Sequence, residues 1–237
     1  MSKTRSIQET CSKGTKDMSY TNTAALSNSK DKCHDPLYYR FIKRAFDITA
    51  SGLMLVIASP VMAGVAIAIK AEDGGPLIYT STRIGSGMKE IDIYKFRSMH
   101  VGAEHHLESL REFNDMGEGP RFKLKNDPRV TKTGKFIRKY SLDELPQLWN
   151  VFKGDVSLIG PRPHSIYEVE QYDDYALQRF NVKSGVLCYS ECCGRSDLLF
   201  KESIDYDIKY LEKHGLLVDA KIILLAAKAV LTGKGAK

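Results

Sequence analysis

The sequence predicts an α+β, mostly helical protein with an N-terminal re-entrant membrane helix, a small mixed α/β core and surface amphipathic helices. Three observations support this fold class. Residues 48–69 contain no charged side chain. Residues 72–185 alternate short apolar segments with glycine and proline turns, and residues 216–231 mix apolar residues with spaced charges. The 237 residues are enough for one domain with a sizeable core and appended segments.

The N-terminal segment, residues 1–36, is rich in Ser, Thr, Lys, Asn and Asp and poor in apolar residues. Such a composition cannot bury enough surface to offset the entropy lost on ordering. We expect a disordered polar tail.

The next segment, residues 37–72, is predicted to enter the membrane. A run of about 20 apolar residues, rising about 1.5 Å per residue, matches the hydrocarbon core of about 30 Å. The alternative is a helix buried in a soluble core, but such helices are usually shorter and more amphipathic. Membrane insertion is therefore the favoured interpretation.

Ser59 and Pro60 stand in the middle of this segment. Proline removes a backbone donor and kinks a helix, and a neighbouring serine can bind the freed carbonyl. Basic residues flank both ends, so the preference for cytoplasmic positive charge is met at both ends only if the helix turns back. We predict a re-entrant helix broken at Ser59-Pro60, with a spanning helix as the alternative.

Residues 73–237 are predicted to form the main domain. Residues 77–79 and 91–94 are strand candidates, and residues 83–87 would connect them as a hairpin loop. Residues 103–113 have helical character. Residues 216–231 predict an amphipathic helix that lies on the membrane surface or, more commonly, packs on the domain.

The charge balance indicates anionic partners. The formal net charge is +6, which suits phosphate groups, acidic lipids or nucleic acid. No aromatic-plus-basic RNA motif or zinc-finger spacing is present, so nucleic acid is not expected as a partner. The five cysteines form no CxxC pair, which favours reduced thiols over a metal site.

Two adjacent carboxylates, Asp143 and Glu144, are the strongest candidates for chemistry. Ser141 followed by Glu144 is also the signature of a capping box, a purely structural alternative. The two readings are compatible, because free N–H groups and the macrodipole at a helix start favour an ionised carboxylate. An aspartate nucleophile must be ionised. Neighbouring helical residues point about 100° apart, so we expect the two carboxylates to have different roles.

Basic residues surround this pair in the sequence. Each one taken alone is more often a solvated surface charge. Arg162 is the exception, because prolines on both sides stiffen its backbone and favour a bidentate grip on phosphate. The candidates for phosphate or substrate binding near the pair are Lys95, Arg97, Arg129, Arg138 and Arg162.

The chain resembles the bacterial sugar transferases, monotopic phosphoglycosyl transferases that act on polyprenyl phosphate. The resemblance covers about residues 43–234. The motifs that carry it are Lys43-Arg44, Ser59-Pro60, Gly75-Pro76, Arg83-Ile84-Gly85, Tyr94-Lys95-Phe96-Arg97-Ser98-Met99, Asp127-Pro128-Arg129-Val130-Thr131, Ser141-Leu142-Asp143-Glu144-Leu145-Pro146-Gln147-Leu148-Trp149-Asn150-Val151, Lys153-Gly154-Asp155 and Ser157-Leu158-Ile159-Gly160-Pro161-Arg162-Pro163.

The resemblance implies an enzyme of the inner membrane with its catalytic domain on the cytoplasmic face. Asp143 would attack a UDP-sugar and release UMP, and a polyprenyl (undecaprenyl) phosphate would then accept the phosphosugar in a ping-pong reaction. Mg²⁺ would bind at Asp143 and Glu144, with Glu144 holding the metal or activating the acceptor. Such enzymes initiate exopolysaccharide, capsule or related glycan synthesis. The later Gly194-Arg195 keeps the family pattern and adds Arg195 to the substrate-binding candidates.

Two departures concern substrate recognition. Family members usually have glutamine where Ser81 stands. Residues 184–191 also replace a Pro-Gly-Ile-Thr-Gly run followed by Trp-Gln, which places Glu191 at a neutral amide position. We expect a negative Glu191 to repel a phosphate and to alter donor preference or activity.

A noncatalytic membrane-surface scaffold that binds anionic lipid or glycan-assembly proteins is the competing hypothesis. It explains the basic charge and the apolar helix, but not the acidic pair beside ordered basic motifs. The sequence leaves open which sugar is moved, which glycan follows, and whether the protein acts as a monomer or a homodimer.

Overall fold

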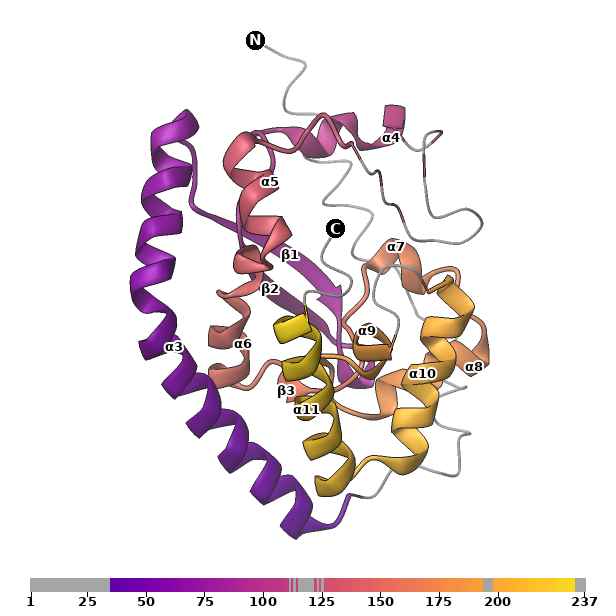
Figure 1. Ribbon diagram of the computed structural model, residues 1–237. Helices are drawn as coiled ribbons and strands as arrows, with labels where there is room; N and C mark the ends of the chain where they lie inside the picture. Colours follow the sequence, from indigo (N-terminus) through magenta and orange to yellow (C-terminus); the bar gives the residue numbers. More distant parts are fainter. Residues whose placement is uncertain are drawn as a thin grey trace. The chain divides into compact units, whose positions relative to one another are not determined.

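A computed structural model describes residues 35–110, 112, 114, 122, 124, 126–193 and 198–232. The predicted polar tail lies almost entirely outside these residues. Residues 33–237 belong to one compact unit. Within it, helices predominate over two small two-stranded sheets, in agreement with an α+β class (Figure 1).

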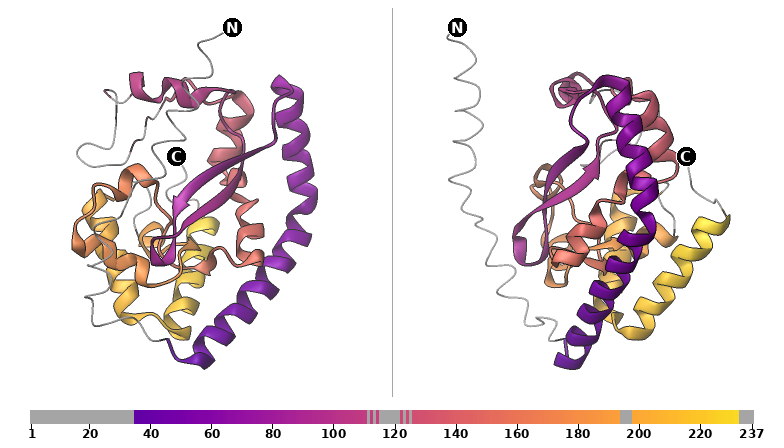
Figure 2. Two further views of the ribbon diagram at one scale, coloured as in Figure 1. Left: turned by 180° about the vertical axis from the view of Figure 1, so that it is seen from behind. Right: turned by 90° about the vertical axis from the view of Figure 1, so that its left-hand side faces the viewer.

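The predicted membrane segment forms one helix, α3 (Leu37–Asp73), which contains Pro60. The hydroxyl of Ser59 donates to the carbonyl of Val56, 2.8 Å away, which is the carbonyl that Pro60 leaves without an N–H partner. This confirms the predicted role of the serine. The axis of α3 changes direction part-way along its length (Figures 1 and 2). Helical hydrogen bonding continues through the proline, so Ser59-Pro60 bends the helix without ending it.

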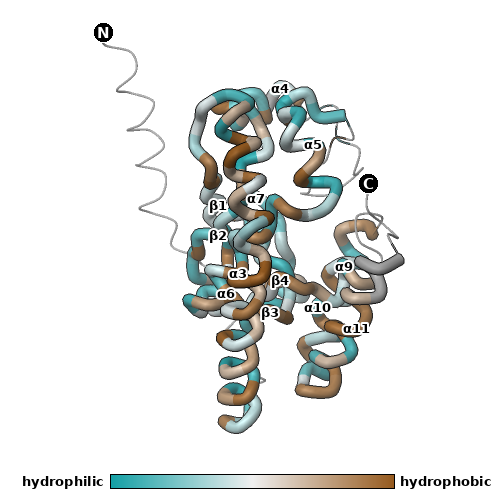
Figure 3. Tube along the Cα trace, turned by 60° about the vertical axis from the view of Figure 1, so that its left-hand side comes forward, coloured by the Kyte–Doolittle hydropathy of each residue, from teal (hydrophilic) through white to brown (hydrophobic). Residues whose placement is uncertain are grey.

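The middle of α3 keeps a broad apolar side exposed, although Met54, Leu55 and Met62 pack partly against the domain. All of its buried residues lie outside the stretch from 52 to 64, and Leu53, Val56 and Ile57 are more than three-fifths exposed. Much of the helix is hydrophobic (Figure 3). Among the described residues, α3 is the helix long and apolar enough to cross a membrane. A soluble core helix would be mostly buried, so this exposure disfavours that alternative.

The N-terminal part of α3 is bound to the domain by polar contacts. The Arg44 guanidinium donates to the carbonyls of Val151 and Phe152, each at 2.8 Å. The buried Asp47 carboxylate accepts from the backbone N–H of Leu158 at 2.9 Å. These contacts join α3 to α6 (Gln147–Lys153) and β3 (Ser157–Ile159).

The C-terminal end of α3 is bound to the same domain. The Glu72 carboxylate accepts from the backbone N–H groups of Lys132 and Thr133 at the start of α5 (Lys132–Lys139). Val65 and Ile69 are buried against Phe96 and Ile137. Both ends of the apolar helix therefore contact one domain, while much of the apolar side of its middle stays exposed.

The predicted hairpin is present, with longer strands than expected. β1 (Ile78–Ile84) pairs antiparallel with β2 (Glu90–Phe96). Arg83 and Ile84 therefore belong to β1 and not to the loop, which contains the short helix η1 (Ser86–Met88). Gly87 has φ 67°, a conformation that suits glycine. A helix was also predicted over residues 103–113, and its described part forms η2 (Ala103–His106) and α4 (Leu107–Leu110).

Asn150 of α6 fixes the helix to the hairpin. It is fully buried, accepts from the N–H of Tyr94 at 3.0 Å and donates to the carbonyl of Asp92 at 2.7 Å. A third bond joins it to the Asp155 carboxylate at 2.9 Å. All of its hydrogen-bonding atoms are engaged, so it holds the element after the acidic pair against β2.

In the second sheet β3 pairs parallel with β4 (Gly185–Leu187), and six further helices complete the described part of the domain. They are α7 (Ile166–Val169), α8 (Asp174–Leu177), η5 (Gln178–Asn181), α9 (Tyr189–Cys193), α10 (Phe200–Lys213) and α11 (Leu216–Thr232). The predicted amphipathic helix is α11. Its Ile222 is fully buried and its Leu217 is 88% exposed, so one side packs on the domain.

Candidate active site

The acidic pair lies on the short helix η4 (Leu142–Glu144), between α5 and α6. Leu142 and Leu145 pack against the cluster that contains Phe96 and Ile137, which anchors this turn to the hairpin and to α5. Ser141 precedes it with φ 54° and makes no side-chain cap. The capping box between Ser141 and Glu144 is therefore wrong, because the left-handed serine does not cap the turn and Glu144 binds elsewhere.

Glu144 binds two cations. Its Oε1 lies 2.9 Å from Lys95 Nζ and 3.2 Å from Arg162 Nη2. Burial acts to raise the pKa of Glu144, but Arg162 and Lys95 outweigh it and hold the pKa at about 2. Glu144 is therefore ionised at neutral pH and is a weak proton acceptor.

Asp143 has a different environment. Within the described part of the chain its carboxylate forms no side-chain hydrogen bond or ion pair. Burial and the negative Glu144 raise the pKa of Asp143, against the opposing effect of Lys95 and Arg138. A backbone hydrogen bond lowers the pKa of Asp143, as expected for the start of a helix, but burial and the like charge outweigh it. Two adjacent carboxylates have opposite pKa shifts, a pattern that marks different roles.

Arg162 follows β3 on the loop predicted to be stiff. The carbonyl of Pro161 accepts from the N–H of Gly185 at 2.8 Å, which ties this loop to β4. A Cβ on Gly185 would stand 2.1 Å from the backbone nitrogen of Gly160, so this close approach requires glycine. The Arg162 guanidinium contacts Glu144 and, very closely, Glu191 of α9. These two carboxylates raise the pKa of Arg162 further above its usual range.

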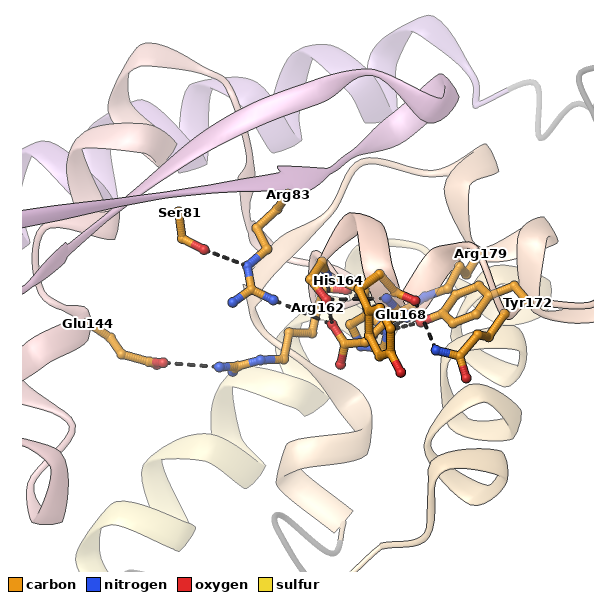
Figure 4. A network of polar contacts seen from close by, with 11 residues as sticks. Ser81, Arg83, Glu144, Arg162, His164, Glu168, Tyr172 and Arg179 are labelled. Carbon is orange, nitrogen blue, oxygen red and sulfur yellow. Dashed lines mark hydrogen bonds and ion pairs between the residues drawn. The ribbon is translucent and has the colours of Figure 1, made fainter. Parts of the chain in front are cut away.

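A buried network supports the backbone of Arg162. The guanidinium of Arg179, which is fully buried, donates to the carbonyl of Arg162 at 2.6 Å and lies 2.6 Å from the Asp207 carboxylate. Tyr172 and His164 contact the same arginine (Figure 4). No local sequence pattern predicts this network, because its members come from four separate segments.

Arg83 lies near Arg162 but was not among the predicted site residues. Its Nε donates to Ser81 Oγ at 2.9 Å, and its Nη1 lies 3.4 Å from the Glu168 carboxylate. Burial lowers the pKa of Arg83, and the nearby positive charge of Arg162 lowers it further. Figure 4 shows the guanidinium groups of Arg83 and Arg162 beside each other. Residues two apart on a strand lie on the same face, so the spacing of Ser81 and Arg83 could have predicted that their side chains meet.

The other predicted cations separate into two groups. Arg138 joins the site, since it influences Asp143 and its Nε donates to Ser98 Oγ at 2.8 Å. Arg97 and Arg129 are buried in ion pairs with Asp73 and Asp127, respectively. The structure thus gathers Lys95, Arg138 and Arg162 around the acidic pair and places Arg97 and Arg129 in other contacts. Arg195 lies outside the described residues.

The oxygen donors at this site fit the chemistry of Mg²⁺. The described residues contain no cluster of three or more His, Cys, Asp or Glu that could form a complete protein site. Mg²⁺ commonly binds one or two carboxylates and completes its coordination with substrate phosphates and water. Asp143 and Glu144 provide adjacent carboxylates of that kind.

Together these features describe a membrane-helix protein with an acidic pair set among arginine and lysine side chains. Residues 38–233 match the family described as bacterial sugar transferase, and the chain belongs to this family.

Three relatives show the range of similarity. The chain is 43% identical over 196 residues to the galactosyl transferase CpsE of Streptococcus agalactiae, covering 82% of this chain and 43% of CpsE. It is 42% identical over 200 residues to the undecaprenyl-phosphate galactose phosphotransferase of Salmonella typhimurium, covering 83% of this chain and 42% of that protein. It is 35% identical over 196 residues to the exopolysaccharide production protein ExoY of Rhizobium meliloti, covering 81% of this chain and 87% of ExoY. The chain thus spans less than half of the first two relatives and most of the third.

Proposed function

We propose that this protein transfers a sugar-1-phosphate from a UDP-sugar to undecaprenyl phosphate and releases UMP, as the initiating step of exopolysaccharide, capsule or related glycan synthesis. The observation that carries the proposal is the carboxylate of Asp143, which forms no ion pair among the described residues and lies next to a Glu144 that two cations hold in place. A scaffold does not require a half-buried carboxylate that lacks an ion-pair partner among the described residues, whereas such a carboxylate suits a nucleophile. The names of the relatives, a galactosyl transferase and a galactose phosphotransferase, favour the same chemistry.

In the first step, an oxygen of ionised Asp143 attacks the sugar-bearing phosphorus of the donor. A new O–P bond forms, and the bond from that phosphorus to the bridging oxygen breaks. UMP leaves with the bonding electrons, and the sugar phosphate stays on the aspartate. Lys95, Arg138 and Arg162 face the negative charge that spreads over the phosphoryl oxygens.

In the second step, an oxygen of undecaprenyl phosphate attacks the same phosphorus. The bond to Asp143 breaks, the carboxylate is restored, and a lipid diphosphate sugar is released. The acceptor carries its own negative charge and requires no strong base. This agrees with the low pKa of Glu144, which makes it a poor proton acceptor.

Glu144 is assigned to metal binding and positioning, and not to activation of the acceptor. Its contacts with Lys95 and Arg162 hold both cations next to the acidic pair. Mg²⁺ bound at Asp143 and Glu144 would neutralise the diphosphate of the donor.

For the membrane arrangement we propose a re-entrant α3 with both ends at the cytoplasmic face of the inner membrane. The support is that Arg44 and Asp47 near one end, and Glu72 at the other, bind the same domain. A helix that crossed the bilayer would separate its ends by about 30 Å of hydrocarbon. The bend and the exposed apolar residues in the middle of α3, such as Leu53, Val56 and Ile57, fit a helix that enters and leaves through one leaflet.

Cysteine labelling tests this topology. In a chain whose native cysteines are replaced by serine, Leu37→Cys and Ala71→Cys are expected to react with a membrane-impermeant maleimide only in inverted vesicles. Ile57→Cys, from the exposed apolar middle, serves as the control and is expected to react in neither orientation. Labelling of positions 37 and 71 from opposite sides would show that α3 spans the bilayer.

The activity is tested by incubating membranes that contain the full chain with a panel of radiolabelled UDP-sugars and undecaprenyl phosphate. We expect one or a few donors to label the lipid fraction and to release UMP. Absence of lipid labelling with every donor, by a folded and membrane-bound protein, would favour the scaffold hypothesis.

A further inference from the structure

Arg162 binds two carboxylates at once. Its Nη2 lies 3.2 Å from Glu144, and its Nη1 makes a very close ion pair with Glu191. A guanidinium binds carboxylate and phosphate oxygens with the same planar geometry. Within the described part of the chain, Glu144 and Glu191 therefore take up the two terminal nitrogens of Arg162, with Glu191 at Nη1.

The two carboxylates are not held equally. Glu144 also binds Lys95 and lies on a turn that is packed against an apolar cluster. Glu191 belongs to α9, a helix of five residues, and its side chain is 38% exposed. Arg162 is its one ion-pair partner among the described residues. Of the two acids, Glu191 is the one that can leave the guanidinium without breaking a second contact.

The arginine itself is fixed. Arg179 holds its carbonyl, and the neighbouring Pro161 carbonyl is bound to β4. These bonds fix the backbone of Arg162, so a phosphate that binds both terminal nitrogens of its guanidinium competes with Glu191 at Nη1. Glu191 was expected from the sequence to repel a phosphate, and the ion pair with Arg162 is the place where the two anions would compete.

We propose that Glu191 occupies the phosphate-binding edge of Arg162 in the free protein and sets the affinity for the donor diphosphate. The proposal rests on the proposed function for the identity of the diphosphate ligand. Donor binding replaces a carboxylate–guanidinium contact with a phosphate–guanidinium contact, and the released carboxylate stays close to the diphosphate as a like charge. Both effects lower the affinity for the donor without touching the reacting atoms.

The test uses the full chain, purified in detergent, and inorganic pyrophosphate as a probe of diphosphate binding. Titration calorimetry on Glu191→Gln and Glu191→Ala is expected to show roughly 5- to 10-fold tighter binding than the unmodified protein, the size of a partly screened charge repulsion. Glu212→Gln, the same chemical change on the exposed face of α10, is the matched control and should stay within about 2-fold.

Unchanged or weaker binding by both Glu191 variants, with melting temperatures like that of the unmodified protein, would mean that Glu191 orients Arg162 for the ligand and would overturn the proposal. Absence of pyrophosphate binding by all four proteins would contradict it as well. Lipid labelling with UDP-sugars is measured on the same preparations. Absence of lipid labelling would contradict the proposed function even if the Glu191 variants bind pyrophosphate more tightly. Lipid labelling without tighter pyrophosphate binding by these variants would contradict the role of Glu191 alone.

Discussion

Replacing Asp143 with asparagine is expected to reduce lipid labelling by at least about 10³-fold, because the amide cannot form the covalent phosphosugar intermediate. Folding and membrane association should be retained. Burial and Glu144 raise the pKa of Asp143. A folded-state pKa above the unfolded value means that ionisation of Asp143 opposes folding at neutral pH. The neutral asparagine should therefore leave the melting temperature unchanged or slightly higher.

The matched control is Asp174→Asn, which makes the same change at an exposed residue of α8. It should keep full activity. Turnover by purified Asp143→Asn protein above the background of the preparation would remove Asp143 from the mechanism. A strongly lowered melting temperature would instead show that the carboxylate has a structural role.

The pH dependence of the unmodified enzyme follows from the same shift. The nucleophile must be ionised, so the rate of UMP release should fall as the pH is lowered through the raised pKa of Asp143. The acidic limb of the profile should therefore lie at a higher pH than an ordinary aspartate would give.

Replacing Glu144 with glutamine is expected to lower the turnover number by about 10²-fold, since Lys95 and Arg162 lose the charge that orients them. Two further readouts separate this role from a merely structural one. Loss of the neighbouring negative charge lowers the pKa of Asp143, so the acidic limb of the remaining activity should move to lower pH. A limb that stays in place would contradict the coupling between the two carboxylates.

Stability provides the second readout for Glu144. Its pKa of about 2 lies below the value in the unfolded chain, so the ionised carboxylate stabilises the folded protein at neutral pH. This contribution is lost as the pH falls toward 2. Glu144→Gln should therefore lower the melting temperature at pH 7, by roughly 3 °C. The difference from the unmodified protein should shrink in acid, while Glu212→Gln should show no such difference.

The sequence predicted those features that depend on local pattern. The uncharged run gave α3, with Ser59 at the carbonyl freed by Pro60, and the alternating segments gave the β1–β2 hairpin. The acidic pair and the stiff Arg162 loop were also found, because adjacent carboxylates and a proline-flanked arginine are visible along the chain.

Features that depend on distant partners could not be predicted from such patterns. Arg97 looked equivalent to Lys95, but the end of α3 places Asp73 against it. Arg129 had its partner two residues away, and that spacing could have been noticed as a local ion pair. The opposite pKa shifts of Asp143 and Glu144 depend on burial and on Arg162, which the sequence does not locate in space.

Mass spectrometry of the covalent intermediate tests the central claim most directly. The purified full chain would be incubated with the donor identified from the panel, without undecaprenyl phosphate, and then digested. A two-step reaction through Asp143 predicts stoichiometric UMP and a peptide containing residue 143 that is heavier by one sugar phosphate, and Asp143→Asn predicts neither. UMP that appears only when undecaprenyl phosphate is added, with the peptide unmodified throughout, would contradict the account.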